Sequence, residues 1–186
     1  MTRLPKLVIL DRDGVVNHDS DDYIRSVDEW VPIEGSLEAI ARLNHAGVLV
    51  AVATNQSGIA RGYFTIDELN RMHAKFQQAL ARVGGHIDGI FFCPHAPDDG
   101  CSCRKPAPGL LRSISLRFSV ALDRVPFIGD TRADVEAARA ARAIPMLVQT
   151  GKGERTLSQH PQFSVLPVFA DLREAVDHIL ARGVSR

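Results

Sequence analysis

The stretch Leu7-Val-Ile-Leu-Asp-Arg-Asp-Gly-Val15 decides the fold, because an apolar run ends directly on two carboxylates, Asp11 and Asp13. An unbroken apolar run predicts a strand that is buried on both faces of a sheet. Similar runs predict further strands at residues 48–53, 89–92, 125–128 and 145–148. Amphipathic patterns predict helices at residues 36–46, 66–82, 108–118, 132–141 and 172–181. We therefore expect an α/β fold with a doubly wound parallel sheet.

The composition is that of an ordinary globular protein. The chain has 186 residues, with 22 Lys and Arg against 22 Asp and Glu, and 45% of its residues are hydrophobic. Its length predicts one domain, residues 1–186, with a sizeable core. The absence of net charge disfavours nucleic acid as a partner. No apolar run has the length of a bilayer span or of a secretion signal, so we expect no membrane association and a cytoplasmic location.

Polar residues follow the predicted strands, at the edge of a parallel sheet where ligands bind. Four clusters occupy this position: Asp11 with Asp13, Thr54 with Asn55, Cys93 with His95, and Gly129 with Asp130. Because the carboxyl ends of parallel strands lie along one edge, we expect the four clusters to converge there.

Asp11 and Asp13 indicate chemistry on a phosphate group. On an extended strand both side chains would point to one face and repel each other unless a cation lay between them. Mg²⁺ prefers such oxygen ligands, and Asp130 would bring a third carboxylate. A carboxylate can attack phosphorus, while Asp13, Thr54 and Lys105 can supply a proton, a hydrogen bond and a positive charge. The alternative is a simple turn or helix cap, which the matching clusters at other strand ends disfavour.

All three cysteines lie in one short loop with a histidine. Cys93, His95, Cys101 and Cys103 are four soft or borderline ligands, which suit tetrahedral Zn²⁺ in a structural site with no open position. Such an ion would order the loop and the basic residues that follow it. The alternative is a set of incidental cysteines, but those are usually scattered and buried. An odd, clustered set is also a poor disulfide framework.

Four motifs together resemble those of the haloacid dehalogenase (HAD) superfamily of phosphatases. They are residues 11–15 (DRDGV), 54–58 (TNQSG), 104–106 (RKP) and 129–130 (GD), and they span nearly the whole chain in the expected order. The resemblance implies a Rossmann-like core in which Asp11 is the nucleophile and Asp13 is the general acid and then the base. It also implies that Thr54 donates a hydrogen bond to the phosphoryl group and that Lys105 balances the phosphoaspartate.

The same resemblance implies a magnesium site. Its ligands would be Asp11, the main-chain carbonyl of Asp13, and Asp130. Asp134 either orients a metal-bound water or lies in the first turn of a helix, where an acidic residue is favoured. The chain has Thr131 where related phosphatases often carry a lysine, so this site lacks one possible positive charge.

The cysteine–histidine loop is similar to that of a capless branch of the superfamily that acts on heptose bisphosphate or on histidinol phosphate. The intervals 14–54 and 58–103 are too short for a separate cap domain, in agreement with this branch. Residues 54–65 are most similar to the heptose group. This implies hydrolysis of the 7-phosphate of D-glycero-D-manno-heptose 1,7-bisphosphate through an aspartyl-phosphate, in ADP- or GDP-heptose biosynthesis. The short metal loop and the last motif are slightly more similar to the histidinol phosphatase group, so histidinol phosphate is the alternative substrate.

A small sugar bisphosphate would contact the loops at the same edge. Arg104 would hold its second phosphate, unless this side chain only covers the metal loop. Asp19 and Asp22, in the acidic loop 17–22, would accept hydrogen bonds from sugar hydroxyls, unless the loop is merely solvated. The second motif adds Asn55, Gln56 and Ser57.

Two other classes of protein would fit parts of the pattern. A receiver-like module that binds phosphate without turnover would have no need of Asp13. A zinc-dependent nucleic-acid protein would need a basic surplus, whereas the metal loop carries Asp98 and Asp99. We therefore expect a monomeric enzyme that uses Mg²⁺ for catalysis and Zn²⁺ for structure.

Overall fold

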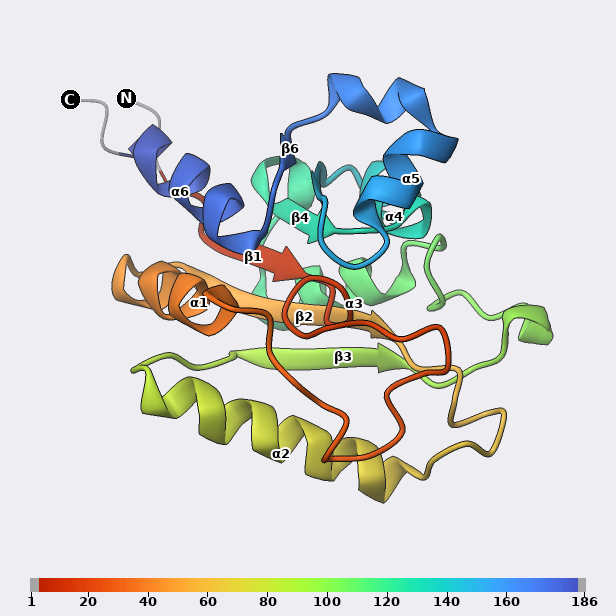
Figure 1. Cartoon of the computed structure of the whole chain (residues 1–186). Helices are drawn as coiled ribbons and strands as arrows, with labels where there is room; N and C mark the ends of the chain where they lie inside the picture. Colours follow the sequence, from red (N-terminus) through yellow and green to blue (C-terminus); the bar gives the residue numbers. More distant parts are fainter. Residues whose placement is uncertain (1–3, 184–186) are drawn as a thin grey trace.

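A parallel six-stranded sheet runs through the described part of the protein, residues 4–183 of a computed structural model (Figure 1). The strands are β1 (Leu7–Leu10), β2 (Leu49–Asn55), β3 (Gly89–Cys93), β4 (Pro126–Gly129), β5 (Ile144–Val148) and β6 (Val168–Phe169). The helices are α1 (Ser36–His45), α2 (Ile66–Arg82), α3 (Gly109–Phe118), α4 (Arg132–Ala141), α5 (Gly153–Gln159) and α6 (Leu172–Gly183). Short 3₁₀ turns lie at Pro97–Asp99, Leu122–Arg124 and Pro161–Val165.

The predicted doubly wound α/β fold is confirmed, with small shifts at the ends of elements. The sequence missed α5 and β6, which lie between β5 and α6. The helix α5 is short and buries only Gly153 and Thr156, so it has no clear amphipathic pattern. The strand β6 has two residues at the edge of the sheet, too few to show a period.

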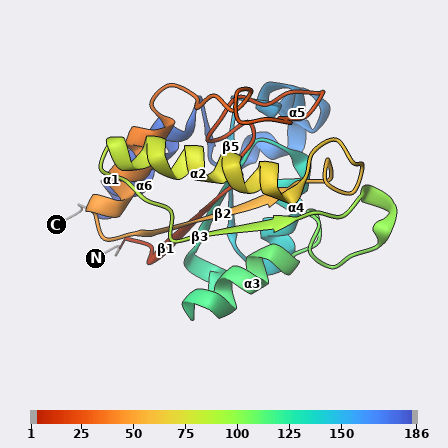
Figure 2. The ribbon, with the colours of Figure 1, turned by 90° about the horizontal axis from the view of Figure 1, so that it is seen from below.

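Alternation along the strands gives the sheet two buried faces. Val8 and Leu10 belong to a large apolar cluster that contains residues of α1, α2 and α6. Leu7 and Ile9 belong to a second cluster, with residues of α3 and α4. Figure 2 shows α1, α2 and α6 on one side of the sheet and α3 on the other. Because the central strands are covered on both faces, their residues are largely apolar up to the carboxyl end, where Thr54 and Asn55 complete β2.

The order of the strands shows where along the sheet a ligand site is expected. The sheet runs β3-β2-β1-β4-β5-β6, so the direction of winding reverses between β1 and β4. The main-chain N–H of Asp11 donates to the carbonyl of Ile128 at 2.9 Å, which joins the ends of these two strands. In such sheets the ligand crevice opens outside the carboxyl ends at the point of reversal. Asp11 and Asp130 follow β1 and β4 and therefore lie at this point.

The described residues contain no separate cap domain. The link between β1 and α1 is an irregular loop, residues 11–35, and the link between β2 and α2 spans residues 56–65. The first loop is held to α2 because the Lys75 ammonium donates to the carbonyls of Val27 and Trp30 at 2.7 and 2.8 Å. The capless architecture is thus confirmed. Over residues 4–183, no helix is both long and apolar enough to cross a bilayer.

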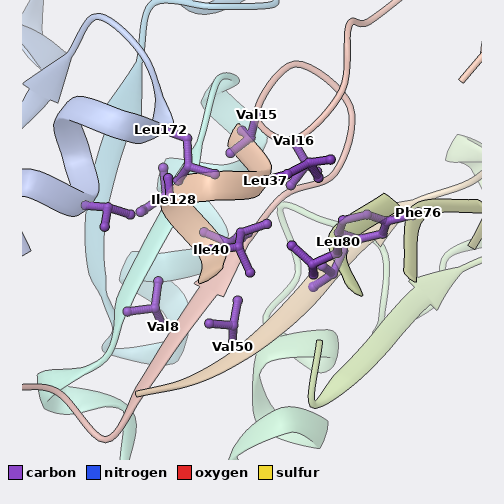
Figure 3. Close-up of a cluster of buried hydrophobic side chains, with 14 of the residues drawn as sticks. Val8, Val15, Val16, Leu37, Ile40, Val50, Phe76, Leu80, Ile128 and Leu172 are labelled. Carbon is purple, nitrogen blue, oxygen red and sulfur yellow. The ribbon is translucent and has the colours of Figure 1, made fainter. Parts of the chain in front are cut away.

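The cluster over β1 and β2 predicts a stability effect. Ile40 of α1 is fully buried among these side chains (Figure 3). Ile40→Ala should lower the free energy of unfolding by about 2–5 kcal/mol, because it removes buried methyl groups and leaves a cavity. Urea unfolding followed by circular dichroism measures this loss. Glu38→Ala, at an exposed position of the same helix, is the control and should change stability by less than about 0.5 kcal/mol. Equal effects of the two substitutions would contradict the assigned core.

Candidate active site

A pocket of about 350 Å³ opens at the carboxyl edge of the sheet. Most residues predicted from the sequence line it, although they come from five separate loops. The lining consists of Asp11, Asp13, Asp19, Ser20, Asp21, Tyr23, Ile24, Thr54, Asn55, Gln56, Ser57, Arg104, Lys105, Asp130, Thr131, Ala133 and Lys152. The expected convergence of the catalytic motifs is therefore observed.

Lys105 forms the centre of the polar contacts beneath the pocket. Its ammonium lies 2.9 Å from Oδ1 of Asp11 and 2.6 Å from Oδ1 of Asp134, and it donates to the carbonyl of Ala53 at 2.8 Å. The residue is only 3% exposed. Burial opposes the charged form, but the two carboxylates outweigh it and raise the pKa of Lys105. The lysine is therefore a permanent cation beside the predicted nucleophile.

Three buried carboxylates share this one cation. Oxygen atoms of Asp11, Asp130 and Asp134 lie within 4.8 Å of one another. Burial raises the pKa of Asp11 to about 7, with Lys105 acting in the opposite direction and Asp134 adding to the rise. Three negative charges against one positive charge leave a deficit of two when all are ionised. One divalent cation would remove that deficit.

Asp130, a member of this cluster, has a buried oxygen without a hydrogen-bond partner. Its Oδ2 accepts from the main-chain N–H of Lys152 at 2.7 Å, whereas its Oδ1 is buried and has no hydrogen-bond partner. Burial, with Asp134 and Asp11 nearby, raises the pKa of Asp130 to about 8. Buried polar atoms without partners are rare in proteins. The residues present thus fit an oxygen-liganded cation such as Mg²⁺.

Asp13 lines the same pocket but is not part of this carboxylate cluster, and its side chain is bound by Arg12. The Arg12 guanidinium donates to both oxygens of Asp13, from Nη2 at 2.9 and 3.0 Å and from Nε at 3.0 Å. Asn17 and Gln56 add hydrogen bonds at 2.8 and 2.9 Å. Burial would raise the pKa of Asp13, but Arg12 and these donors outweigh it and lower the pKa. The two carboxylates are therefore neutralised by different cations, and Arg12 was not among the residues predicted from the sequence.

Arg12 is in turn supported from α2. The arginine is 1% exposed, and its Nη1 lies 3.5 Å from Nε2 of His73. Burial, together with Arg12, lowers the pKa of His73 to about 4, so the ring is neutral and can accept from the guanidinium. This contact explains why a polar histidine lies beneath the motif.

Residues 54–57 of the second motif line the pocket, and some of them also hold other site residues in place. Thr54 is buried, and its hydroxyl accepts from the Gln56 amide at 2.9 Å. Asn55 lines the pocket, but both polar atoms of its side chain bond the main chain of Lys105, at 3.0 and 3.1 Å. Asn55 therefore positions Lys105, a role that differs from the substrate contact expected for it. Ser57 is buried at the wall of the same pocket.

The acidic loop contributes Asp19 and Asp21 to the pocket, and the prediction for Asp22 is not supported. Asp22 is exposed and is not part of the lining. The chain turns at the next residue, Tyr23, which has a φ of 68° and does line the pocket. The irregular turn breaks any simple alternation of inward and outward side chains, so sequence spacing could not select the right aspartates.

The predicted metal loop brings its four residues together, next in sequence to two residues that line the pocket. The Sγ atom of Cys93 lies 3.4 Å from Nδ1 of His95, 3.6 Å from Sγ of Cys101 and 3.1 Å from Sγ of Cys103. His95 and Cys101 lie 3.2 and 3.5 Å from Cys103. Such separations suit ligands around one tetrahedral ion. Arg104 follows directly, lines the pocket, and donates to the carbonyl of His95 at 3.4 Å.

Asp134 lies in the first turn of α4, which is one of the two roles that the sequence left open. Its Oδ2 accepts from the main-chain N–H and the hydroxyl of Thr131, at 3.0 and 2.6 Å, which caps α4. Its other oxygen pairs with Lys105. The residue is therefore a helix cap that also holds the catalytic-edge lysine. Whether it orients a metal-bound water stays a prediction.

Lys152 was missed by the sequence analysis. It follows β5 at the same edge of the sheet and lines the pocket. Its ammonium lies 2.8 Å from Oδ2 of Asp19. The signal was present, because the polar residues 149–152 follow the predicted strand 145–148 just as the other clusters follow theirs.

A parallel sheet that carries Asp11, Asp13, Lys105 and Asp130 at its point of reversal has the arrangement of a HAD-type phosphatase. A family model described as HAD-hydrolase-like matches residues 102–175. The D-glycero-beta-D-manno-heptose-1,7-bisphosphate 7-phosphatase of Pseudomonas putida is 55% identical over 90% of this chain and 95% of its own. The enzyme of the same name from Pseudomonas aeruginosa is 54% identical over 94% and 97%.

A solved structure agrees with these relatives. The D,D-heptose 1,7-bisphosphate phosphatase of Bordetella bronchiseptica, complexed with magnesium and phosphate, matches with a TM-score of 0.92 and 52% identity. The match covers 95% of this chain and 98% of that chain. The protein described here therefore belongs to the family of heptose-1,7-bisphosphate 7-phosphatases within the HAD superfamily.

The carboxylate cluster predicts a pH-dependent stability in the absence of metal. The pKa of Asp130 is raised from 3.8 to about 8, so this group favours the folded state below pH 4 and loses that contribution as the pH rises towards 8. In EDTA, Asp130→Asn should be more stable than the wild type at pH 8, by at least about 1 kcal/mol, and no more stable at pH 4. Urea titrations at both pH values measure this. A variant that is less stable than the wild type at pH 8 would contradict the assigned charge deficit.

Proposed function

We propose that this protein hydrolyses the 7-phosphate of D-glycero-β-D-manno-heptose 1,7-bisphosphate and releases the heptose 1-phosphate. The observation that supports this most strongly is the pairing of a lysine-bound Asp11 with a separately neutralised Asp13 at one pocket. The names of the relatives supply the sugar and its β configuration. The mechanism is inferred from the catalytic side chains that meet at the strand ends.

In the first step Asp11 attacks phosphorus, and the bond from phosphorus to the sugar O7 breaks. The carboxylate is kept available by Lys105, which also balances the phosphoryl group that Asp11 then carries. Asp13 gives its proton to the leaving O7. Arg12 lowers the pKa of Asp13 in the free site, so the incoming negative phosphate must favour protonation of Asp13 before this step. Thr54 offers a hydroxyl to the phosphoryl oxygens.

In the second step Asp13, now a carboxylate, takes a proton from a water molecule. The water oxygen attacks phosphorus, the bond from phosphorus to Asp11 breaks, and inorganic phosphate leaves. The Arg12, Asn17 and Gln56 hydrogen bonds suit this step, because they stabilise the ionised form of Asp13 and fix its direction. The contacts of the free site therefore favour the second displacement, whereas the first depends on protonation of Asp13 when the phosphate arrives.

Magnesium is the cation that we propose for the carboxylate cluster. Asp11 and Asp130 would hold it, with the main-chain carbonyl of Asp13, and the unpartnered oxygen of Asp130 supports this choice. When bound, Mg²⁺ neutralises the two uncompensated charges and the charge that develops on the phosphoryl oxygens. The related Bordetella enzyme was solved with magnesium and phosphate.

Arg104 is the group that we propose for the second phosphate. Its guanidinium lines the pocket, and its one described polar contact is a long bond to a carbonyl. A planar guanidinium is well suited to bind a phosphate by two hydrogen bonds. Histidinol phosphate has no second phosphate, so it would leave Arg104 without a partner. The predicted monomeric state and cytoplasmic location stay predictions.

The proposed function predicts a sharp substrate preference. With Mg²⁺, phosphate release from the heptose 1,7-bisphosphate should exceed release from histidinol phosphate, and Asp11→Asn should lower it by about 10⁴-fold or more. Asp67→Asn, the same substitution at an exposed position of α2, is the matched control and should retain wild-type activity. A preference for histidinol phosphate would overturn the substrate, and unchanged activity of Asp11→Asn would overturn the mechanism.

We also propose that Zn²⁺ fills the cysteine–histidine cluster as a structural ion. Its four ligand atoms leave no open position, and the loop continues directly into Arg104 and Lys105. Metal analysis should find about one zinc per chain, and Cys101→Ser should reduce the zinc content and the thermal stability together. Ser102→Ala, at the exposed neighbouring position, should keep both. A zinc-free wild type of full stability would contradict a structural ion.

A further inference from the structure

The loop between β5 and α5 brings one lysine into contact with two different parts of the site. The main-chain N–H of Lys152 donates to Oδ2 of Asp130 at 2.7 Å. Its ammonium lies 2.8 Å from Oδ2 of Asp19 and 3.5 Å from Oδ1 of Asp21, both in the acidic loop. Lys152, Asp19 and Asp21 all line the pocket. One residue thus links the carboxylate cluster to the loop expected to contact the sugar.

We propose that Lys152 is a positioning residue that holds Asp19 at the pocket wall, where Asp19 accepts hydrogen bonds from hydroxyl groups of the substrate. This inference rests on the proposed function and deepens it, because it assigns a residue to recognition of the sugar instead of its phosphates. Lys152 acts through Asp19 and makes no contact with the reacting atoms.

The contacts of Asp19 suit an acceptor of fixed direction. Its Oδ1 accepts from the main-chain N–H of Ser20 at 2.8 Å, and its Oδ2 pairs with Lys152. A carboxylate offers about four lone-pair sites, so two stay available for hydroxyl donors. The side chain of Asp19 is 17% exposed, whereas that of Asp21 is 77% exposed. Asp19 is therefore the partner that Lys152 holds in the pocket, and Asp21 is an outer contact.

Lys152 and Arg104 both line the pocket, but only Lys152 is paired with carboxylates. Lys152 is compensated by Asp19 and Asp21, so a phosphate would have to displace them. Over the described part of the chain, Arg104 forms no ion pair with a carboxylate, and it is free to take the second phosphate. The acidic side chains around Lys152 would also repel a phosphate and accept from hydroxyls. This end of the pocket therefore favours the polyol part of a sugar.

The loop itself is fixed by contacts that do not involve the lysine side chain. The hydroxyl of Thr150 donates to the carbonyl of Gly14 at 2.6 Å, and that of Thr156 donates to the carbonyl of Asp130 at 2.8 Å. Gly151 has a φ of +58°, and a Cβ there would lie 2.4 Å from Oδ2 of Asp130. Removing the ammonium of Lys152 therefore leaves the loop and the bond to Asp130 in place. The side chain can be tested separately from the fold.

The test is a double-mutant cycle of Lys152→Met and Asp19→Asn in the full chain with Mg²⁺. Each variant is assayed with heptose 1,7-bisphosphate and with p-nitrophenyl phosphate, which has no sugar hydroxyls. Each single substitution should raise KM for the sugar roughly tenfold or more, the size expected for a charge-assisted hydrogen bond. The ratio of kcat/KM for the sugar to that for the aryl phosphate should fall by a similar factor. The double variant should be no worse than the worse single variant, because both remove one unit.

Two further variants check the assignment. Arg155→Met removes a guanidinium that lies 3.9 Å from Asp21 and outside the pocket lining, and it should leave the sugar-to-aryl ratio unchanged. Lys152→Arg restores the charge and should recover part of the lost ratio.

Three results would overturn the inference. Additive effects of the two substitutions would show that Lys152 acts on the substrate independently of Asp19. An unchanged KM for the sugar in either single variant would show that the pair has no part in recognition. Equal losses on the sugar and the aryl phosphate would indicate a purely structural role. A wild type that hydrolyses only the aryl phosphate would instead refute the proposed function, so the two failures are distinguishable.

Discussion

The contact of the Lys105 ammonium with Asp11 and Asp134 is the constraint on which the rest of the site depends. Without this cation, three carboxylates within 4.8 Å of one another would face each other in a buried space, and they would bind protons instead of ionising. With it, the cluster still carries a deficit that suits a divalent cation. Asn55 fixes the main chain of Lys105, and Asp134 fixes its side chain while capping α4. Parts from four strand ends are therefore coupled through one lysine.

A second pairing makes two carboxylates of one motif chemically different. Asp13 is only two residues from Asp11, yet Arg12 between them binds both of its oxygens and favours its charged form. A nucleophile and a proton-transfer group need different charge states in the same step. Arg12, which is buried against α2 through His73, holds Asp13 in the ionised form that the second step needs, so the arriving phosphate has to favour protonation of Asp13 for the first step. The fold contributes by placing the motif where the winding of the sheet reverses.

Much of this arrangement could be predicted from the sequence, and the failures have physical reasons. The apolar runs predicted the strands of the sheet, and the polar residues directly after them predicted the functional edge. Both predictions use the same rule, which is that ligands bind at the carboxyl ends of buried parallel strands. In the acidic loop Asp19 lines the pocket as expected, whereas Asp22 does not, and the irregular turn with a positive φ at Tyr23 is a feature that no spacing rule predicts. Asn55 was identified as a site residue, but its role depends on a contact fifty residues away. Lys152 follows a predicted strand as the other site residues do, but it begins a segment without a clear helical period, and it was not among the predicted residues.

The most direct test of the account is to trap the covalent intermediate on Asp11. The Asp13→Asn variant is mixed with Mg²⁺ and p-nitrophenyl phosphate, whose leaving group departs without a proton from the enzyme, and the reaction is quenched in acid. Because the variant cannot activate water, mass spectrometry of the peptide that contains residues 7–15 should show one added phosphoryl group, located on Asp11. Unmodified peptide, or a phosphoryl group on another residue, from a variant that still releases nitrophenol would contradict the central role of Asp11.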